Sequence, residues 1–247
     1  VTAMLLQAIA NLANDFFDFK HGFDLPGRTG PLRVMQNGLV NPKSFAAVIF
    51  VFSVVAVLLG LILVWHGGWP ILLTGAVSLA FAFLYSAGPW PLSCHALGEA
   101  ASVFFFGLVA TGGAFYLQTH SLNFTVLWLS LTPGLLIACI MMVNNYRDME
   151  IDRQTGKKTL ADFLGPRGAL RLYVAAIIGA YGITVIAAVL LPSISWWALL
   201  ALLSLPLGIK VIQGMYRKTG PALNQTLTQT ALLTFCTSLL LSIGLML

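Results

Sequence analysis

Long apolar runs alternate with short polar segments along the whole chain. Seven of the runs are about 20 residues long, which is enough for a helix to cross the hydrocarbon core of a bilayer. They span residues 44–65, 70–87, 97–118, 125–146, 169–191, 195–213 and 226–246. An eighth run, 1–17, is shorter and begins at Val1 rather than at a methionine, so we expect a helix cut short at its N-terminus. The pattern predicts an all-α, polytopic transmembrane bundle of about eight helices, in a single domain of residues 1–247.

The composition supports this prediction. Hydrophobic residues make up 58% of the chain and charged residues 9%, whereas about 25% of residues are charged in soluble domains. The three cysteines have neither metal-ligand spacing nor the pattern of a disulfide framework. We therefore expect an integral membrane protein in contact with lipid, and no nucleic-acid partner.

The charged residues are confined to one side of the predicted membrane. When the connections are assigned alternately to the two sides, all 13 Lys and Arg and all eight Asp and Glu fall on the same side. The positive-inside rule makes that side cytoplasmic. The opposite connections are short and lack Asp, Glu, Lys and Arg, and four tryptophans lie near them. We expect a bacterial plasma-membrane protein whose active face is cytoplasmic.

Two polar segments on this face begin alike. "NDFFD" at 14–18 and "NNYRD" at 144–148 both place Asn four residues before Asp, and a further acid follows each, Asp24 and Asp152. Basic residues with Thr and Leu come next, in "RTGPLR" at 28–33 and "GKKTL" at 156–160. The repetition suggests a duplicated four-helix unit with two polar clusters facing each other across the bundle, where membrane proteins commonly place their sites.

The residue types in these clusters favour Mg²⁺ and a diphosphate. Oxygen ligands four residues apart share a helix face, and Mg²⁺ is usually held by one or two carboxylates together with substrate phosphates. The absence of His and Cys from the motifs argues against zinc. The candidate metal ligands are Asn14, Asp18, Asp148 and Asp152. Nearby bases suited to phosphate are Arg28, Arg33, Arg147, Arg153, Lys157 and Lys158.

An apolar bundle interior beside a diphosphate site indicates an isoprenoid diphosphate substrate. Mg²⁺ and the bases would stabilise the leaving diphosphate as the allylic C–O bond ionises, and the carbocation would then attack an electron-rich acceptor. Exclusion of water would protect that cation. The aromatic run at 104–106 is either packing or an apolar wall whose π-faces stabilise the cation.

Four segments resemble signature segments of the UbiA superfamily of intramembrane prenyltransferases, especially its menaquinone-pathway branch. They are "NLANDFFDFKHGFD", "RTGPLR", "LYSAGPWPLSCHALGE" and "NNYRDMEIDRQTGKKTL". The resemblance implies nine transmembrane helices in the intact protein, the first of which is missing from this chain. It also implies Mg²⁺-dependent transfer of a long-chain polyprenyl group from its diphosphate to 1,4-dihydroxy-2-naphthoate, with loss of CO₂, giving demethylmenaquinol.

The resemblance also suggests roles for individual residues. Asn14 and Asp18 match the first metal–diphosphate motif, and Asp148 and Asp152 match the second. Arg33, Arg147 and Lys157 fall where bases contact diphosphate, and Asn144 and Asn145 form a polar wall beside them. Tyr85 falls near the reacting carbon and the acceptor. Weaker candidates are Asp15, Asp24 and Glu99. Relatives often carry a base near 90–93, where this chain reads "WPLS".

Two alternatives remain open. The acceptor could instead be 4-hydroxybenzoate, homogentisate or a porphyrin-type alcohol, because the acceptor pocket is little determined by the sequence. An ion-coupled transporter would also carry intramembrane acids, but these should lie near the membrane mid-plane on broken helices. Here the acids lie at helix ends on one face.

Overall fold

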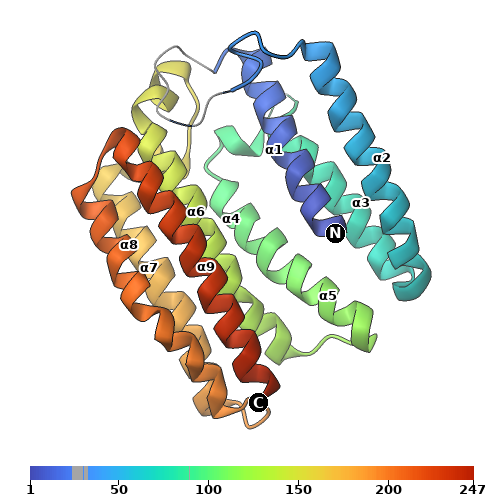
Figure 1. The fold of residues 1–247 in the computed structure, drawn as a ribbon, viewed down its shortest axis with the longest axis vertical. Coiled ribbons are helices and arrows are strands. Elements are labelled where there is room, and N and C mark those ends of the chain that lie inside the picture. Colours follow the sequence, from blue (N-terminus) through green and yellow to red (C-terminus); the bar gives the residue numbers. More distant parts are fainter. Residues whose placement is uncertain (24–29, 31–32, 89) are drawn as a thin grey trace.

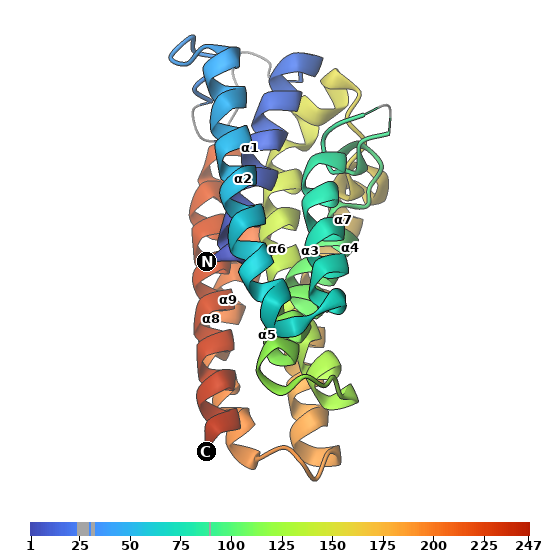
Figure 2. The same cartoon turned by 90° about the vertical axis from the view of Figure 1, so that its right-hand side faces the viewer.

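The computed structural model describes residues 1–23, 30, 33–88 and 90–247. Within them the regular structure is helical, and eight rods run roughly along the long axis of the molecule (Figures 1 and 2). The rods comprise α1 (Thr2–His21), α2 (Pro42–Gly67), α3 (Trp69–Leu84), the continuous α4 (Gly98–Ser102), η2 (Val103–Val109) and α5 (Ala110–Thr119), α6 (Phe124–Thr155), α7 (Leu160–Leu190), η3 (Trp196–Ser204) leading into α8 (Leu205–Arg217), and α9 (Leu223–Met246). Short 3₁₀ turns are η1 (Leu92–Cys94) and η4 (Gly220–Ala222).

Within the described residues, six helical stretches are long and apolar enough to cross a membrane, which confirms the predicted polytopic bundle. They are Pro42–Gly67, Gly98–Thr119, Phe124–Thr155, Leu160–Leu190, Trp196–Arg217 and Gly220–Met246, and the apolar α3 is shorter. At the end opposite the Asp-containing motifs, the side chains of Trp65, Trp69, Trp196 and Trp197 are exposed. This placement suits an interfacial aromatic belt.

Several helices extend beyond their apolar runs. α1 continues to His21, where Gly22 adopts the left-handed conformation (φ 73°), and α6 continues to Thr155 before Gly156 (φ 78°). The metal-ligand candidates of each motif therefore lie on continuous helices, about one turn apart. α7 begins at Leu160 rather than near 169, and Gly165 (φ 68°, ψ 173°) interrupts its first turns. The predicted span 70–87 ends at Leu84.

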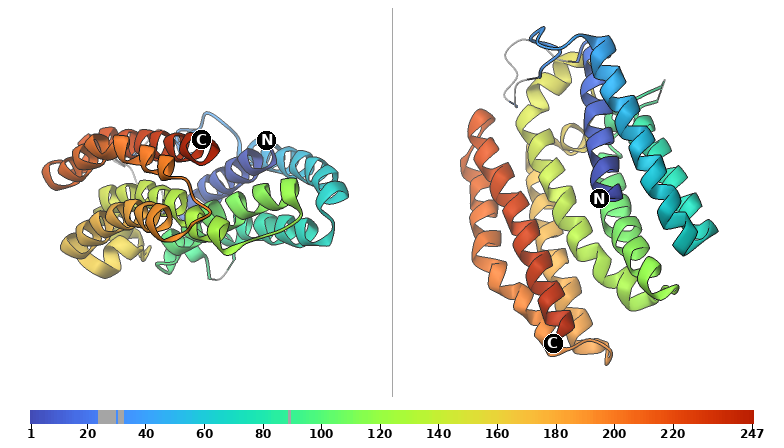
Figure 3. Two further views of the ribbon diagram at one scale, coloured as in Figure 1. Left: turned by 90° about the horizontal axis from the view of Figure 1, so that it is seen from below. Right: turned by 45° about the vertical axis from the view of Figure 1, so that its right-hand side comes forward.

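The helices form two groups joined by the α4–η2–α5 rod. α6, α7, α8 and α9 pack together on one side, and α1, α2 and α3 on the other (Figures 1 and 3). The first group has the larger core, centred on Tyr173, Leu136 and Leu233. Hydroxyl groups link its helices, as between Tyr173 and Thr230 (2.8 Å) and between Tyr181 and Ser204 (2.7 Å). Such bonds are worth about 1 kcal/mol each between membrane helices.

A π-helical segment, η2, packs against α6 through two glycines. A Cβ on Gly107 would lie 2.8 Å from the backbone oxygen of Ser130 and 3.1 Å from the Cα of Gly134. The two backbones are therefore in contact, and no larger side chain fits between them without displacement. This contact fixes the position of the phenylalanines at 104–106 relative to α6.

Candidate functional site

Asp18, near the C-terminal end of α1, joins two basic side chains from distant segments. Its carboxylate accepts hydrogen bonds from Arg33 (2.9 Å) and from Lys157 (3.3 Å), and only 4% of Asp18 is exposed. Asp15, one turn earlier, also pairs with Arg33 at 3.5 Å. A buried charge needs a partner of opposite sign, and these basic side chains provide it.

The second cluster is centred on Arg147 of α6. Its guanidinium donates to both carboxylate oxygens of Asp148 (2.8 and 2.6 Å). It also donates to the side-chain oxygens of Asn144 (2.7 Å) and of Asn224 on α9 (2.6 Å). Both the arginine and the aspartate are more than 90% buried, so this is a bidentate pair within the protein interior.

Backbone and side-chain hydrogen bonds hold the two motif segments together with the segment that follows α3. The amide of Ala96 donates to the carbonyl of Lys158 (3.0 Å), and the amide of Lys157 donates to the carbonyl of Asp152 (2.9 Å). Asn14 of the first motif donates to the hydroxyl of Ser86 (2.9 Å). The segments predicted to face each other are thus brought to one end of the bundle.

A cavity of about 1240 Å³ opens beside these clusters and continues between the helices. One end is polar and includes Asn14, Asp15, Arg33, Asn144, Asn145 and Lys157. The remainder is largely apolar, with contributions from α1, α2, α3, the α4–η2–α5 rod and α6. Its volume exceeds the roughly 300–1,000 Å³ of pockets for drug-sized ligands. The cavity therefore fits a ligand with a charged head and a large hydrocarbon body.

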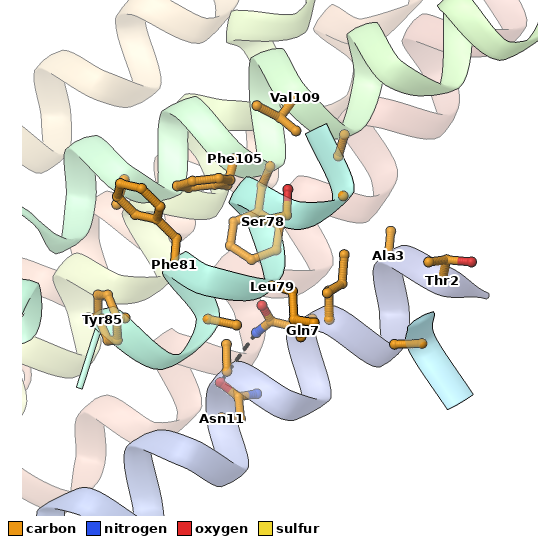
Figure 4. A pocket seen from close by; sticks show the side chains of 18 of the residues that line it. Thr2, Ala3, Gln7, Asn11, Ser78, Leu79, Phe81, Tyr85, Phe105 and Val109 are labelled. Atoms are coloured by element: carbon orange, nitrogen blue, oxygen red, sulfur yellow. Dashed lines mark hydrogen bonds between the residues drawn. The ribbon is translucent and has the colours of Figure 1, made fainter. Parts of the chain in front are cut away.

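The aromatic residues of the cavity come from two facing helices. Phe81 of α3 and Phe105 of η2 lie with their ring centroids 5.0 Å apart. Figure 4 shows both rings with Tyr85 on the side of the cavity opposite α1. Phe105 and Phe106 line the cavity, whereas Phe104 is 48% exposed. Of the two interpretations of the aromatic run, the cavity wall therefore applies to Phe105 and Phe106.

A group of closely packed lining residues lies where the segment after α3 meets α4 and α6. The hydroxyls of Tyr85 and Ser102 both donate to the sulfur of Met141, at 3.6 and 3.7 Å. A Cβ on Gly98 would lie 2.8 Å from that sulfur and 2.9 Å from the Tyr85 oxygen, so glycine is required for this approach. One helical turn nearer the polar end, Asn145 donates to the buried Glu99 carboxylate (2.9 Å).

The structure divides the predicted site residues into three sets. Those that line the cavity are Asn14, Asp15, Arg33, Tyr85, Asn144, Asn145 and Lys157. Those bonded directly to a lining residue are Asp18, Glu99 and Arg147, and Asp148 is bonded to Arg147. Asp152 lies on the last turns of α6, and Lys158 follows that helix with an exposed side chain. Asp24 and Arg28 lie outside the described residues.

The oxygen-donor set fits Mg²⁺ bound together with a diphosphate. Within the described part of the chain, no three His, Cys, Asp or Glu side chains are grouped closely enough to hold a metal ion by themselves. Mg²⁺ does not require such a group, because it commonly takes one or two carboxylates plus substrate phosphates. The carboxylate of Asp18 instead holds two cations that also line the cavity.

Several polar residues at the site have no counterpart in the sequence predictions. Asn11 and Gln7 line the cavity about one and two turns before Asn14 on α1, respectively, and are hydrogen-bonded to each other (3.3 Å; Figure 4). Ser86 and Asn224 are bonded to motif residues from 72 and 77 residues away. The sequence did carry a signal for the residues on α1. Gln7, Asn11 and Asn14 are side-chain amides spaced four and then three residues apart in an otherwise apolar run.

The thiol nearest the polar end is that of Cys94 in the loop after α3. Burial raises its pKa, although the hydrogen bond from Ser93 and the charge of Lys157 oppose this effect. A thiol kept neutral is a poor nucleophile. The chemistry of the site therefore depends on its carboxylates, amides and basic groups.

The molecule is a helical membrane bundle with paired Asn/Asp motifs and basic groups at one end, beside a long and largely apolar cavity. This combination defines an intramembrane enzyme for amphiphilic anions. The chain belongs to the UbiA prenyltransferase family, whose model matches residues 1–245. It is therefore an integral membrane prenyltransferase, of a family that binds prenyl diphosphate and an aromatic acceptor.

Among curated relatives, the chain is 33% identical over 255 residues to the 1,4-dihydroxy-2-naphthoate octaprenyltransferase of Escherichia coli, covering 100% of this chain and 82% of the relative. It is 30% identical over 246 residues to the enzyme of the same name from Bacillus subtilis, covering 99% and 79%. A solved digeranylgeranylglyceryl phosphate synthase matches with a TM-score of 0.59 at 15% identity, covering 97% of this chain and 81% of that one. This likeness supports the fold.

Proposed function

We propose that the protein transfers a long-chain polyprenyl group from its diphosphate to 1,4-dihydroxy-2-naphthoate, with loss of CO₂, giving demethylmenaquinol. The observation that carries the proposal is the division of one cavity into a polar end beside both motifs and a long apolar remainder. The diphosphate fits the first part and the polyprenyl chain the second. The relatives named above support the choice of acceptor.

The diphosphate would be held by basic groups that already lie at the cavity. Arg33 and Lys157 both pair with Asp18. We infer that their donors turn to the diphosphate when it binds, which frees the carboxylate of Asp18 for Mg²⁺. Asn14 supplies a second oxygen on the same helix face, and Asp148 and Asp152 supply the ligands of the second motif. Bound Mg²⁺ would neutralise charge on the leaving diphosphate.

The aromatic and apolar walls would protect the reacting carbocation. Tyr85, Phe81 and Phe105 come from two helices beside the polar end. Ring faces stabilise cations, and the apolar surroundings exclude the water that would otherwise capture an allylic cation. The acceptor would lie near Tyr85, between the diphosphate and these rings.

An acceptor panel tests the proposal. Purified protein in detergent or proteoliposomes is incubated with Mg²⁺, octaprenyl diphosphate and one acceptor at a time, including dihydroxynaphthoate, 4-hydroxybenzoate and homogentisate. We expect prenylation of dihydroxynaphthoate with release of CO₂ from its carboxylate. Consumption of 4-hydroxybenzoate or homogentisate with dihydroxynaphthoate unchanged would show the acceptor assignment to be wrong.

A further inference from the structure

Two neighbouring asparagines of α6 line the same cavity but are oriented by opposite kinds of partner. The side-chain oxygen of Asn144 accepts a hydrogen bond from Arg147 (2.7 Å), whereas the side-chain nitrogen of Asn145 donates to Glu99 (2.9 Å). A guanidinium is a donor only, and a carboxylate is an acceptor only. The partners therefore fix which end of each amide is committed.

The remaining end of each amide determines what it can bind. Asn144 retains its NH₂ group, which suits the acceptor-only oxygens of a diphosphate. Asn145 retains its carbonyl oxygen, to which no described residue donates a side-chain hydrogen bond. A carbonyl oxygen cannot bind a diphosphate oxygen, but it can accept from a hydroxyl. The two adjacent residues are thus complementary to two different substrates.

The surroundings of Asn145 include an aromatic residue that lines the same cavity. Glu99 and Ser102 lie one turn apart on α4, and they contact Asn145 and Met141, which lie one turn apart on α6. Tyr85 is bonded to the same Met141 (3.6 Å). Asn145, Tyr85, Ser102 and Met141 all line the cavity.

Glu99 has the properties of a residue that positions another. It is only 4% exposed, it does not line the cavity, and the amide of Asn145 is bonded to its Oε1 atom. Its second oxygen, Oε2, is buried and has no hydrogen-bond partner in the described structure. Burial of an acidic side chain within a membrane protein costs free energy. Among the described residues, the side chain of Glu99 is hydrogen-bonded to one cavity-lining side chain, the amide of Asn145.

We propose that Asn145 accepts a hydrogen bond from a hydroxyl group of the aromatic acceptor, and that Glu99 positions it by binding its NH₂ group. This rests on the proposed function and refines it by assigning Asn145 to the acceptor instead of the diphosphate. The site then requires an acceptor with a ring hydroxyl, and Asn144 and Asn145 separate the two substrates along one turn of α6.

Exchanging the two side-chain types tests the proposal. Glu99→Gln lets the paired amides bond in either direction, so the carbonyl of Asn145 is no longer held toward the cavity. Asn145→Asp places two carboxylates together. The double variant Glu99→Gln/Asn145→Asp restores a donor–acceptor pair and leaves one carboxylate oxygen for the cavity. Asp162→Asn, which alters an acid that pairs with Arg153 away from the cavity lining, is the control.

We expect each single variant to raise the KM for the acceptor roughly threefold to tenfold, as for loss of one neutral hydrogen bond. The KM values for prenyl diphosphate and for Mg²⁺ should stay within twofold, and the double variant should recover most of the loss. The control should match the wild type. Melting temperatures and size-exclusion profiles identify any variant that fails to fold, and the double variant then decides the outcome.

Unchanged acceptor KM in both folded single variants would overturn the proposal. A rise confined to the KM for Mg²⁺ or for prenyl diphosphate would overturn it equally, since Asn145 would then belong to the other substrate. Calorimetric binding of dihydroxynaphthoate, or of whichever hydroxyarene the wild type prenylates, gives the same comparison without turnover. Failure of the wild type to transfer a prenyl group is thereby distinguished from failure of this pairing.

Discussion

Three glycines from three helices widen the apolar part of the cavity. Gly60 of α2, Gly75 of α3 and Gly113 of α5 all line it, and a Cβ added at any of them would meet no atom within 4 Å. Gly113 lies eleven residues beyond Ser102 on one continuous rod, or about 16 Å along the helix axis. The space beside it is therefore distant from the diphosphate end, where only the later units of a polyprenyl chain would lie.

Gly113→Leu should consequently discriminate between substrates by chain length. The cavity has room for the new side chain, so we expect the variant to fold normally. The leucine nevertheless occupies volume that a long polyprenyl chain needs. Forcing extra apolar atoms into a filled space costs about 1–3 kcal/mol. That range corresponds to a decrease of about 5- to 150-fold in kcat/KM for a long substrate. A substrate too short to reach Gly113 should be unaffected.

Competition between geranyl diphosphate and octaprenyl diphosphate, with products separated by chromatography, measures the ratio directly. Gly182→Leu is the matched control, because Gly182 lies in the membrane helix α7, also has nothing within 4 Å, and does not line the cavity. If Gly113→Leu leaves the ratio at the wild-type value, the polyprenyl chain does not pass this glycine and our placement of it is wrong. An equal loss with both substrates would also refute the reasoning.

Three further predictions concern the metal, the first motif and the helix contact. Removal of divalent cations with EDTA should abolish turnover and added Mg²⁺ should restore it, as measured by product formation; persistent activity would refute a metal requirement. Asp18→Asn should lower kcat roughly 100-fold or more, and a near-wild-type rate would remove Asp18 from the site. Gly107→Ala should destabilise the protein by about 1–3 kcal/mol, seen as a lower melting temperature, because its Cβ would meet the Ser130 backbone oxygen at 2.8 Å. An unchanged melting temperature would show that η2 can shift away from α6.

The apolar runs predicted the helices well but not where they end. Hydropathy reports the limits of the membrane, whereas a helix continues for as long as its backbone hydrogen bonds and side chains allow. α6 therefore extends through the polar residues 147–155, which lie beyond its apolar run, and ends only at the left-handed Gly156. The same holds for α1, which ends at Gly22. The missing signal for both boundaries was the glycine that ends the polar segment after each apolar run, Gly22 for α1 and Gly156 for α6.

The paired motifs could be found because each is local and repeated, whereas their partners could not. Ser86 lies within the predicted span 70–87 and Asn224 lies just before the predicted span 226–246, and only the packing of the helices brings them to Asn14 and Arg147. Hydrogen bonds between residues so far apart in sequence depend on tertiary structure. The sequence therefore predicted that the two motifs lie at one end of the bundle, but not the contacts that they make there.

The position of a residue in a motif does not determine its contacts, as Arg147 and Arg33 show. Both were predicted to bind diphosphate, and both are largely buried. Arg33 lines the cavity beside Asp18, whereas Arg147 does not line it and donates to Asp148, Asn144 and Asn224. If Arg147 turned toward a diphosphate, the buried carboxylate of Asp148 would lose its bidentate partner, at a cost of several kcal/mol unless Mg²⁺ took its place. The role of Arg147 is therefore linked to metal binding at Asp148, and that of Arg33, which already lines the cavity, is linked in the same way to metal binding at Asp18.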